Sequence, residues 1–253
     1  ELGESPDCFE SLLHLVNQNL SIAHLTLDRA GIDDIQGMGL LQSLHLRQSH
    51  LLSLNLNGNK LCTDTLEIGF TNYKLFECMY SLCLANIGME DEGLQALGEA
   101  LLQKPLAQLY IGENAFSDWT PILTLLSSET NQIQLLDASR NEITSSTTLA
   151  LAEVLKKQTS LTTLVLRGMI STPVHSLSPL FSALAENRSL TALWVTNLNK
   201  TLDLQCLHEL DVALHSNFVV MSCGDLPRYG PCEQKKAQNV KRQKNLVELA
   251  ATQ

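Results

Sequence analysis

Residues 106–116 read LAQLYIGENAF, and this stretch carries the spacing that decides the fold. Written as L-x-x-L-x-L-x-x-N-x-L, with an apolar residue at each L, the spacing recurs in LLSLNLNGNKL at 51–61 and in IQLLDASRNEI at 133–143. Eight copies start 27 to 29 residues apart, with first apolar residues at Ile22, Leu51, Met79, Leu106, Ile133, Leu161, Leu190 and Phe218. So regular a period predicts a repeat architecture, in which each unit buries its apolar face against its neighbours.

Each copy predicts a short strand followed by a helix. Strand side chains alternate between two faces, so the apolar positions point inward, while the Asn side chain bonds backbone groups of neighbouring turns. The linkers then carry leucines at i, i+3 and i+7, which line one face of a helix. These sets are Leu94, Leu97 and Leu101, then Leu177, Leu180 and Leu184, then Leu207, Leu210 and Leu214.

The motif identifies leucine-rich repeats, and a strand-helix unit of this length resembles the ribonuclease-inhibitor-like subfamily over roughly residues 20 to 230. The resemblance implies an α/β solenoid shaped as a horseshoe, with about eight repeats of 27–29 residues. Parallel strands would line its concave face and helices its convex face. The resemblance is specific for the fold and implies no single activity, because the repeated positions are those that pack.

We expect one leucine-rich repeat domain over 1–253, with an N-terminal cap helix within 1–21, repeats over 22–230, and a C-terminal cap or basic segment over 231–253. Residues 7–19 predict the cap helix, with Asp7 or Ser5 as its N-cap and a buried stripe of Phe9, Leu12, Leu13 and Val16. The Asn position drifts to Ala30, Ile87, Met169, Leu198 and Leu226, where backbone groups need other partners. The chain begins with Glu1 and shows no signal peptide, so we expect it to be excised from a longer protein.

Composition limits the partners that this chain can attract. Its formal charge of -10 disfavours direct binding of DNA or RNA, and no apolar run is long enough to cross a bilayer. Seven cysteines without a repeated short spacing indicate reduced thiols and an intracellular protein, cytoplasmic or nuclear. The basic residues Lys235, Lys236, Lys241, Arg242 and Lys244 fit the solvated face of a cap helix; the alternatives are a nuclear import signal and a contact for an acidic partner.

No catalytic or cofactor motif is present. A phosphate loop, paired-cysteine metal spacing, H-E-x-x-H, G-x-S-x-G and a dinucleotide fingerprint are all missing. His208 and His215 share a helix face, but no cysteine or carboxylate completes an obvious metal shell. We therefore predict a protein that is not an enzyme and that needs no cofactor or metal.

The repeat register names the residues of the concave face, which lie beside the central apolar anchors and just after each strand. A solvated face of a parallel sheet that carries large aromatic side chains is a candidate binding face, since Tyr, Trp and Arg supply most strong interface anchors. The candidate strip on the fourth to seventh repeats consists of Tyr110, Glu113, Asp137, Arg140, Arg167 and Trp194. The alternative is that Trp194 packs on a flanking loop and the charges only keep the surface hydrated.

The strip favours a protein-interaction module that has a scaffold or sensor role, and we expect the domain to be monomeric. Such repeats resemble those of nucleotide-binding sensor receptors, bacterial effectors and Tonsoku-like scaffolds. The alternatives are a GTPase-activating domain of the Ran-activating type and a ribonuclease-inhibitor-type inhibitor. The first is believed to use an acidic tail, whereas this chain ends in basic residues. Ribonuclease inhibitors are richer in cysteine and more regular.

Overall fold

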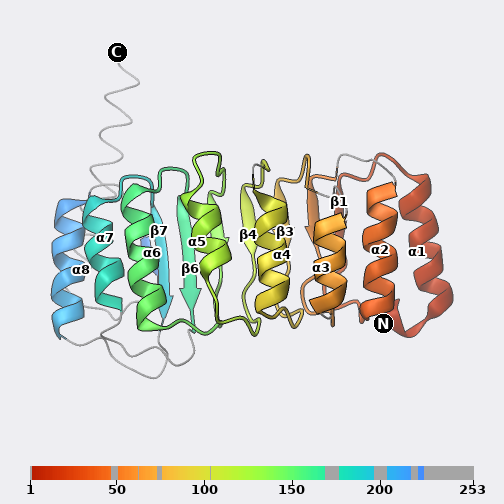
Figure 1. The fold of residues 1–253 in the computed structure, drawn as a ribbon, viewed down its shortest axis with the longest axis horizontal. Helices are drawn as coiled ribbons and strands as arrows, with labels where there is room; N and C mark the ends of the chain where they lie inside the picture. Colours follow the sequence, from red (N-terminus) through yellow and green to blue (C-terminus); the bar gives the residue numbers. More distant parts are fainter. Residues whose placement is uncertain are drawn as a thin grey trace, which may run out of the picture. The chain divides into compact units, whose positions relative to one another are not determined.

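The computed structural model describes residues 2–46, 51–61, 63–72, 76–102, 104–168, 177–196, 204–217 and 222–224 (Figure 1). The basic cluster at 235–244 and the drifted motif positions Met169, Leu198 and Leu226 lie outside these residues. Contacts divide the chain into two compact units, 1–141 (unit 1) and 142–253 (unit 2), and each is described by itself.

Unit 1 alternates helices with three-residue parallel strands that pair in chain order. A short 3-10 helix, η1 (Leu2–Glu4), comes first. The helices are α1 (Pro6–Gln18), α2 (Asp34–Leu46), α3 (Thr63–Asn72), α4 (Asp91–Leu101) and α5 (Thr120–Ser127). The strands are β1 (His24–Thr26), β2 (Ser53–Asn55), β3 (Ser81–Cys83), β4 (Gln108–Tyr110) and β5 (Leu135–Asp137). Each of the four pairings is parallel, as the repeat motif predicts.

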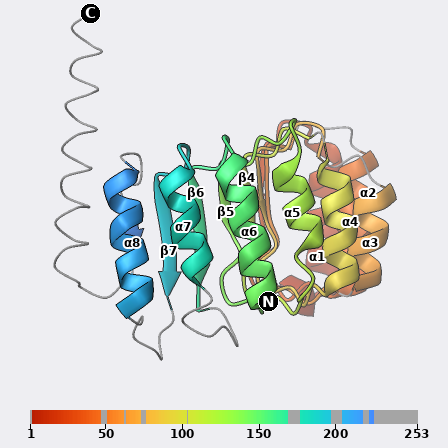
Figure 2. The same ribbon diagram turned by 60° about the vertical axis from the view of Figure 1, so that its left-hand side comes forward.

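Unit 2 continues the same alternation. Its helices are α6 (Ser145–Lys157), α7 (Ser178–Glu186) and α8 (Leu204–Ser216), and its strands are β6 (Thr163–Arg167), β7 (Ala192–Thr196) and β8 (Ser222–Gly224). The strand β6 pairs with β7 and β7 with β8, both in parallel. In each unit the helices cover one face of the strands (Figures 1 and 2). We call the opposite face the open strand face; it corresponds to the concave face of the sequence prediction.

The central leucine of each strand forms an internal row. In unit 1, Leu25, Leu54, Leu82, Leu109 and Leu136 stand in register on successive strands and are all buried. In unit 2, Leu164 stands in register with Leu193. The helical leucines predicted to face inward are buried as well wherever the structure describes their side chains, among them Leu97 and Leu180. The leucine-rich repeat fold is therefore confirmed.

The recurring Asn of the motif forms a ladder of hydrogen bonds between the repeats of unit 1. Asn114 donates from Nδ2 to the carbonyls of Leu84 (2.9 Å) and Ile111 (3.0 Å), and its Oδ1 accepts from the amides of Ile87 (3.2 Å) and Met89 (3.1 Å). Ile87 itself occupies a drifted Asn position, so its backbone is satisfied by the Asn of the next repeat.

Asn59 and Asn141 bond in the same way. Asn59 donates to Leu27 and Leu56, and Asn141 donates to Ile111 and Ala138.

Unit 2 contains a second polar ladder, which the sequence motif did not reveal. Asn187 and Asn217 are buried just after the C-terminal ends of α7 and α8. Asn187 donates to the carbonyl of Leu155 (2.6 Å) and accepts from the amide of Leu190 (2.7 Å), while Asn217 donates to the carbonyl of Asn187 (2.6 Å). These side chains join consecutive repeats at the beginning of each strand.

The last repeat differs from the sequence prediction by two residues. Cys223 pairs with Leu193, which moves the first apolar position of this repeat from Phe218 to residue 220. Counted from Phe218 and Leu190, the predicted register places Ser222 in line with Trp194. This register is wrong, because Ser222 pairs with Ala192 and Gly224 with Trp194. A register shift of two residues leaves the same side chains on the same face of the strand, so the alternation of apolar and polar residues cannot distinguish the two registers.

The helix predicted over residues 7–19 corresponds to α1, and its role as an N-terminal cap stays a prediction. Its N-cap is Ser5, without a capping hydrogen bond from its side chain, and Pro6 fills the first turn. Phe9 and Val16 are buried, whereas Leu12 and Leu13 are only half-buried. The predicted stripe is thus correct at its two ends and shallower in its middle.

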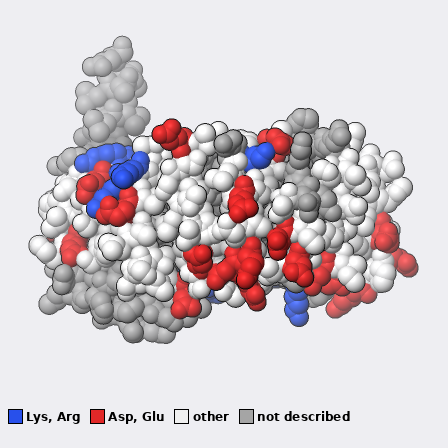
Figure 3. Space-filling view, in the orientation of Figure 1, with Lys and Arg blue, Asp and Glu red and all other residues white. Residues whose placement is uncertain are grey.

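Negative charge gathers on the helical side of unit 1, toward the lower ends of α3 and α4 in the view of Figure 3. The first turns of these helices carry Asp64, Asp91 and Glu92, and the first turn of α2 carries Asp34. Carboxylates are stabilised there by the positive end of the helix dipole. No helix in the described part of the chain is long and apolar enough to span a bilayer.

Candidate functional site

The open strand face of unit 1 carries a row of five side chains, one from each strand. Thr26, Asn55, Cys83, Tyr110 and Asp137 follow the buried central leucines and stand in register from β1 to β5. Cys83, Tyr110 and Asp137 are each partly exposed. Two residues of the predicted strip, Tyr110 and Asp137, are therefore direct neighbours on adjacent strands.

Tyr110 lies in a small cluster that also includes Tyr80, Cys83 and Asp137; we call these four residues the tyrosine cluster. Partial burial raises the pKa of Tyr110 above its usual value, and the negative charges that Cys83, Asp137 and Tyr80 carry when ionised raise this pKa further. Burial also raises the pKa of Cys83, with a smaller contribution from Asp28. At neutral pH the phenol and the thiol are both uncharged, so Tyr110 can donate a hydrogen bond.

Tyr80 is the site residue that sequence reasoning missed. It follows the first apolar residue of its repeat, Met79, and is 49% exposed. The prediction counted outward residues only around the later anchors of each strand. A large aromatic residue directly after the first apolar residue of a repeat is the sequence feature that indicates this site residue.

Asp137 is held by a local turn. Its Oδ1 accepts from the amide of Ser139 (3.0 Å) and from the Ser139 hydroxyl (2.6 Å). Asn55 makes the equivalent turn on β2, where Oδ1 accepts from the amide of Asn57 at 2.9 Å. Such turns fix the carboxylate at the strand end, next to Tyr110 in the register.

Just after each strand of unit 1, one residue adopts a left-handed backbone conformation. These residues are Arg29 (φ 49°), Gly58 (φ 69°), Asn86 (φ 53°), Glu113 (φ 57°) and Arg140 (φ 57°). Glu113 and Arg140 form an ion pair of 2.9 Å between Oε1 and Nη1, and their side chains are 46% and 60% exposed. The strip residues Glu113 and Arg140 are thus partners that neutralise each other at the surface.

In unit 2, the two remaining strip residues lie together. The guanidinium carbon of Arg167 lies 4.4 Å from the centroid of the Trp194 ring, which is a cation–π contact. Val165 stands in register with Trp194, and Arg167 follows two residues later on the same strand face. Trp194 is half-buried and Arg167 is exposed.

The structure therefore groups the six predicted residues into three pairs: Tyr110 with Asp137, Glu113 with Arg140, and Arg167 with Trp194. The first two pairs belong to unit 1 and the third to unit 2. One continuous strip through all six residues stays a prediction. Among the described residues, no group of three or more His, Cys, Asp or Glu side chains is arranged to hold a metal ion.

Comparisons with known proteins find fold likenesses only. No family model and no curated protein matches the sequence. Similar solved structures include leiomodin-1 actin-binding site 2, with 17% identity and a TM-score of 0.30 over 98% of this chain and 100% of that chain. Another is the tropomodulin C-terminal domain of Caenorhabditis elegans, with 12% identity and a TM-score of 0.29 over 96% and 98% of the two chains. Neither likeness assigns a partner to this chain.

Proposed function

We propose that this chain is a protein-interaction module and that its partner binds the open strand face. The observation that carries the proposal is the stack of Arg167 on a half-buried Trp194, on the strand face that the helices leave uncovered. Trp and Arg are the residue types that most often dominate binding energy, because each buries a large surface and offers a polar or cationic contact.

The stack is ready for binding before any partner arrives. The guanidinium is already ordered against the ring, so less side-chain entropy is lost when a partner covers both groups. Complete burial of an aromatic side chain contributes about 1.5–3 kcal/mol. Trp194 is already half-buried in the free chain, so a partner can bury only the part of its surface that is still exposed. A loss of about 1 kcal/mol or more is therefore expected for Trp194→Ala.

The tyrosine cluster supplies a second anchor of the same kind in unit 1. Tyr110 offers an aromatic face and a neutral hydroxyl, and Asp137 offers a carboxylate beside it. Tyr110→Ala should cost about as much as Trp194→Ala. Charge reversal at Asp137 or Arg167 should mainly change the association rate and its salt dependence, because interface charges steer encounter.

The experiment is affinity capture from a cell extract with the whole chain, followed by mass spectrometry and by titration calorimetry with the identified partner. Trp194→Ala and Tyr110→Ala should each weaken binding by about fivefold or more, which corresponds to about 1 kcal/mol. Gln95→Ala on α4 and Lys157→Ala on α6, both at exposed helical sites, are the controls and should bind normally.

Alkylation gives an independent readout on the same face. Cys83 belongs to the row of five side chains on the open strand face of unit 1, so a bound partner should slow its reaction with iodoacetamide, while the exposed Cys8 on α1 should react as before. Loss of capture in the helical controls, with Trp194→Ala and Tyr110→Ala binding normally, would refute the proposal.

A further inference from the structure

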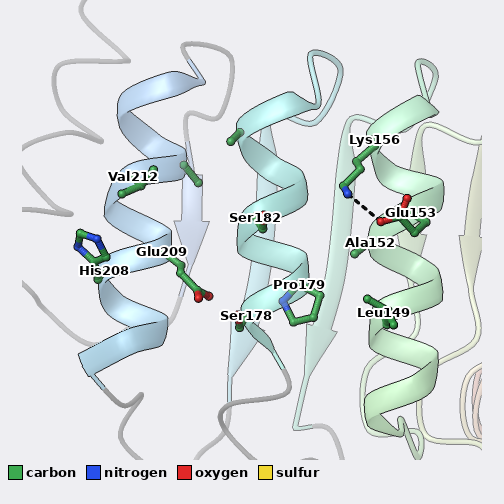
Figure 4. A pocket seen from close by; sticks show the side chains of 12 residues that line it. Leu149, Ala152, Glu153, Lys156, Ser178, Pro179, Ser182, His208, Glu209 and Val212 are labelled. Carbon is green, nitrogen blue, oxygen red and sulfur yellow. Dashed lines mark hydrogen bonds and ion pairs between the residues drawn. The ribbon is translucent and has the colours of Figure 1, made fainter.

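The helical side of unit 2 contains a groove of about 480 Å³ above α7, between α6 and α8 (Figure 4). Its floor is formed by Ser178, Pro179, Ser182 and Ala185 of α7. No side chain of this floor is larger than a proline ring. The groove therefore exists because the outer face of α7 is lower than those of the two helices beside it.

Two exposed apolar side chains flank this floor. Leu149 on α6 is 55% exposed and Val212 on α8 is 46% exposed, and both line the groove. The floor residues Ser178, Ser182 and Ala185 recur at i, i+4 and i+7, so they form one low line along α7. Such a line lets a second helix approach closely, and the nine residues of α7 extend for about 13 Å, or two to three helical turns.

The groove is bordered by an excess of negative charge. On the α6 wall, Nζ of Lys156 lies 2.7 Å from Oε1 of Glu153 and 3.9 Å from Oε1 of Glu186 at the end of α7. Glu209 borders the groove from α8 (Figure 4). Two carboxylates, Glu153 and Glu209, therefore line the groove with one ammonium group, that of Lys156, and a cationic ligand is complementary to this border.

We propose that this groove binds an amphipathic helix of a partner protein, with Lys or Arg residues flanking its apolar stripe. The stripe would pack on Leu149, Val212 and the α7 floor, and the flanking cations would face Glu153 and Glu209. A helix suits the site because its backbone groups are satisfied internally, and the groove offers no strand edge to an extended peptide. This site lies on the helical side and is independent of the function proposed for the open strand face.

The test is selection of helical peptides from a display library on the whole chain, followed by fluorescence anisotropy with the enriched peptides. Enriched sequences should carry apolar residues at i, i+3 or i+4, and i+7, with Lys or Arg beside them. Ser182→Trp, which fills the floor, should weaken their binding at least tenfold. The matched control is Ser127→Trp, which adds the same side chain at an exposed site on α5 and should leave binding unchanged. Far-UV circular dichroism and urea midpoints verify that both variants fold.

Charge exchange tests the border of the groove. The double variant Glu153→Lys with Glu209→Lys should weaken the basic peptides at least tenfold, and peptides with Glu in place of Lys should then regain affinity.

A parallel selection on the Ser182→Trp variant gives the background, and the proposal is overturned if the unaltered chain enriches no peptides beyond it. The proposal is also overturned if the enriched peptides are acidic, or if they bind the Ser182→Trp variant as tightly as the unaltered chain. Self-association of the chain that Ser182→Trp removes would assign the groove to a second copy, and binding of phosphatidylcholine vesicles that the same variant removes would assign it to lipid. Either result would also overturn the proposal.

Discussion

Asn114→Ala offers the sharpest test of the ladder that joins the repeats of unit 1. The side chain is 9% exposed, and its Oδ1 accepts from two amides, those of Ile87 and Met89. Alanine leaves both amides without this acceptor. An unsatisfied buried donor costs about 1–3 kcal/mol, so the two amides together give about 2–6 kcal/mol. Because water reaches the slightly exposed site in part, we expect a loss near the lower half of this range, about 3 kcal/mol.

Asn59 and Asn141 provide a graded comparison within the same unit. Oδ1 of Asn59 accepts from the amide of Ile32 (3.0 Å), and Oδ1 of Asn141 accepts from the amide of Asn114 (2.9 Å), so each satisfies one amide instead of two. Their alanine variants should each cost about 1–3 kcal/mol, less than Asn114→Ala.

The assay exploits the two tryptophans of the chain. Trp119 is buried in unit 1 beside Phe116, and its fluorescence reports on unit 1 once Trp194 is replaced by Phe. In this background, urea unfolding should show a midpoint more than about 1 M lower for Asn114→Ala, since the slope for a domain of this size is about 2–3 kcal/mol per molar urea.

The exposed residue Gln132 is the control, and Gln132→Ala should leave the midpoint unchanged. Asn57 is unsuited to this role, because its Oδ1 accepts from the amide of Ala85 at 2.7 Å and so also links two repeats. Equal midpoints for Asn114→Ala and Gln132→Ala would refute the ladder as a source of stability.

Three further predictions concern single side chains. Asn187→Ala should destabilise unit 2 by about 2–4 kcal/mol, measured by urea unfolding in a Trp119→Phe background, because two amides and a carbonyl lose their partner; an unchanged midpoint would contradict this. Cys83 should react with iodoacetamide more slowly than exposed Cys8 near pH 8, and its rate should rise further with pH, since burial raises its pKa and lowers its thiolate fraction; peptide mass spectrometry measures both rates. Asp137→Asn should lower the pKa of Tyr110, because it removes a negative charge that opposes the phenolate. The titration of Tyr110 is followed at 295 nm as the absorbance difference between a chain with Tyr110 and the same chain with Tyr110→Phe, once with Asp137 and once with Asn at that position. An unchanged pKa would mean that the two groups do not interact.

The stacking of the repeats was predictable because it follows from a burial pattern. Leu54, Leu82 and Leu109 hold equivalent places in the motif, and only one register buries all of them at once. This argument does not fix the register of the last strand. A repeat that starts at Phe218 and one that starts at residue 220 differ by two residues, so both bury the same face of the strand. Only pairing with β7 distinguishes the two registers.

The site was predictable to the level of register and no further. Alternation placed Tyr110 and Trp194 outward, but the stack of Arg167 on Trp194 depends on rotamers, which no sequence pattern contains. The groove of unit 2 was missed for a different reason. Sequence reading looked for large apolar residues on α7, whereas the groove depends on the small residues Ser178 and Ser182.

The left-handed residues after the strands show where stability has been given up. Arg29, Glu113 and Arg140 occupy a conformation that Gly adopts freely, at a cost of about 1 kcal/mol or more each. The ion pair between Glu113 and Arg140 is exposed and contributes about 0–1 kcal/mol, which is too little to offset two such residues. Folding alone would favour glycine at both places, as at Gly58. Glu113→Gly and Arg140→Gly should therefore stabilise unit 1, and the same changes would remove two side chains of the candidate strip.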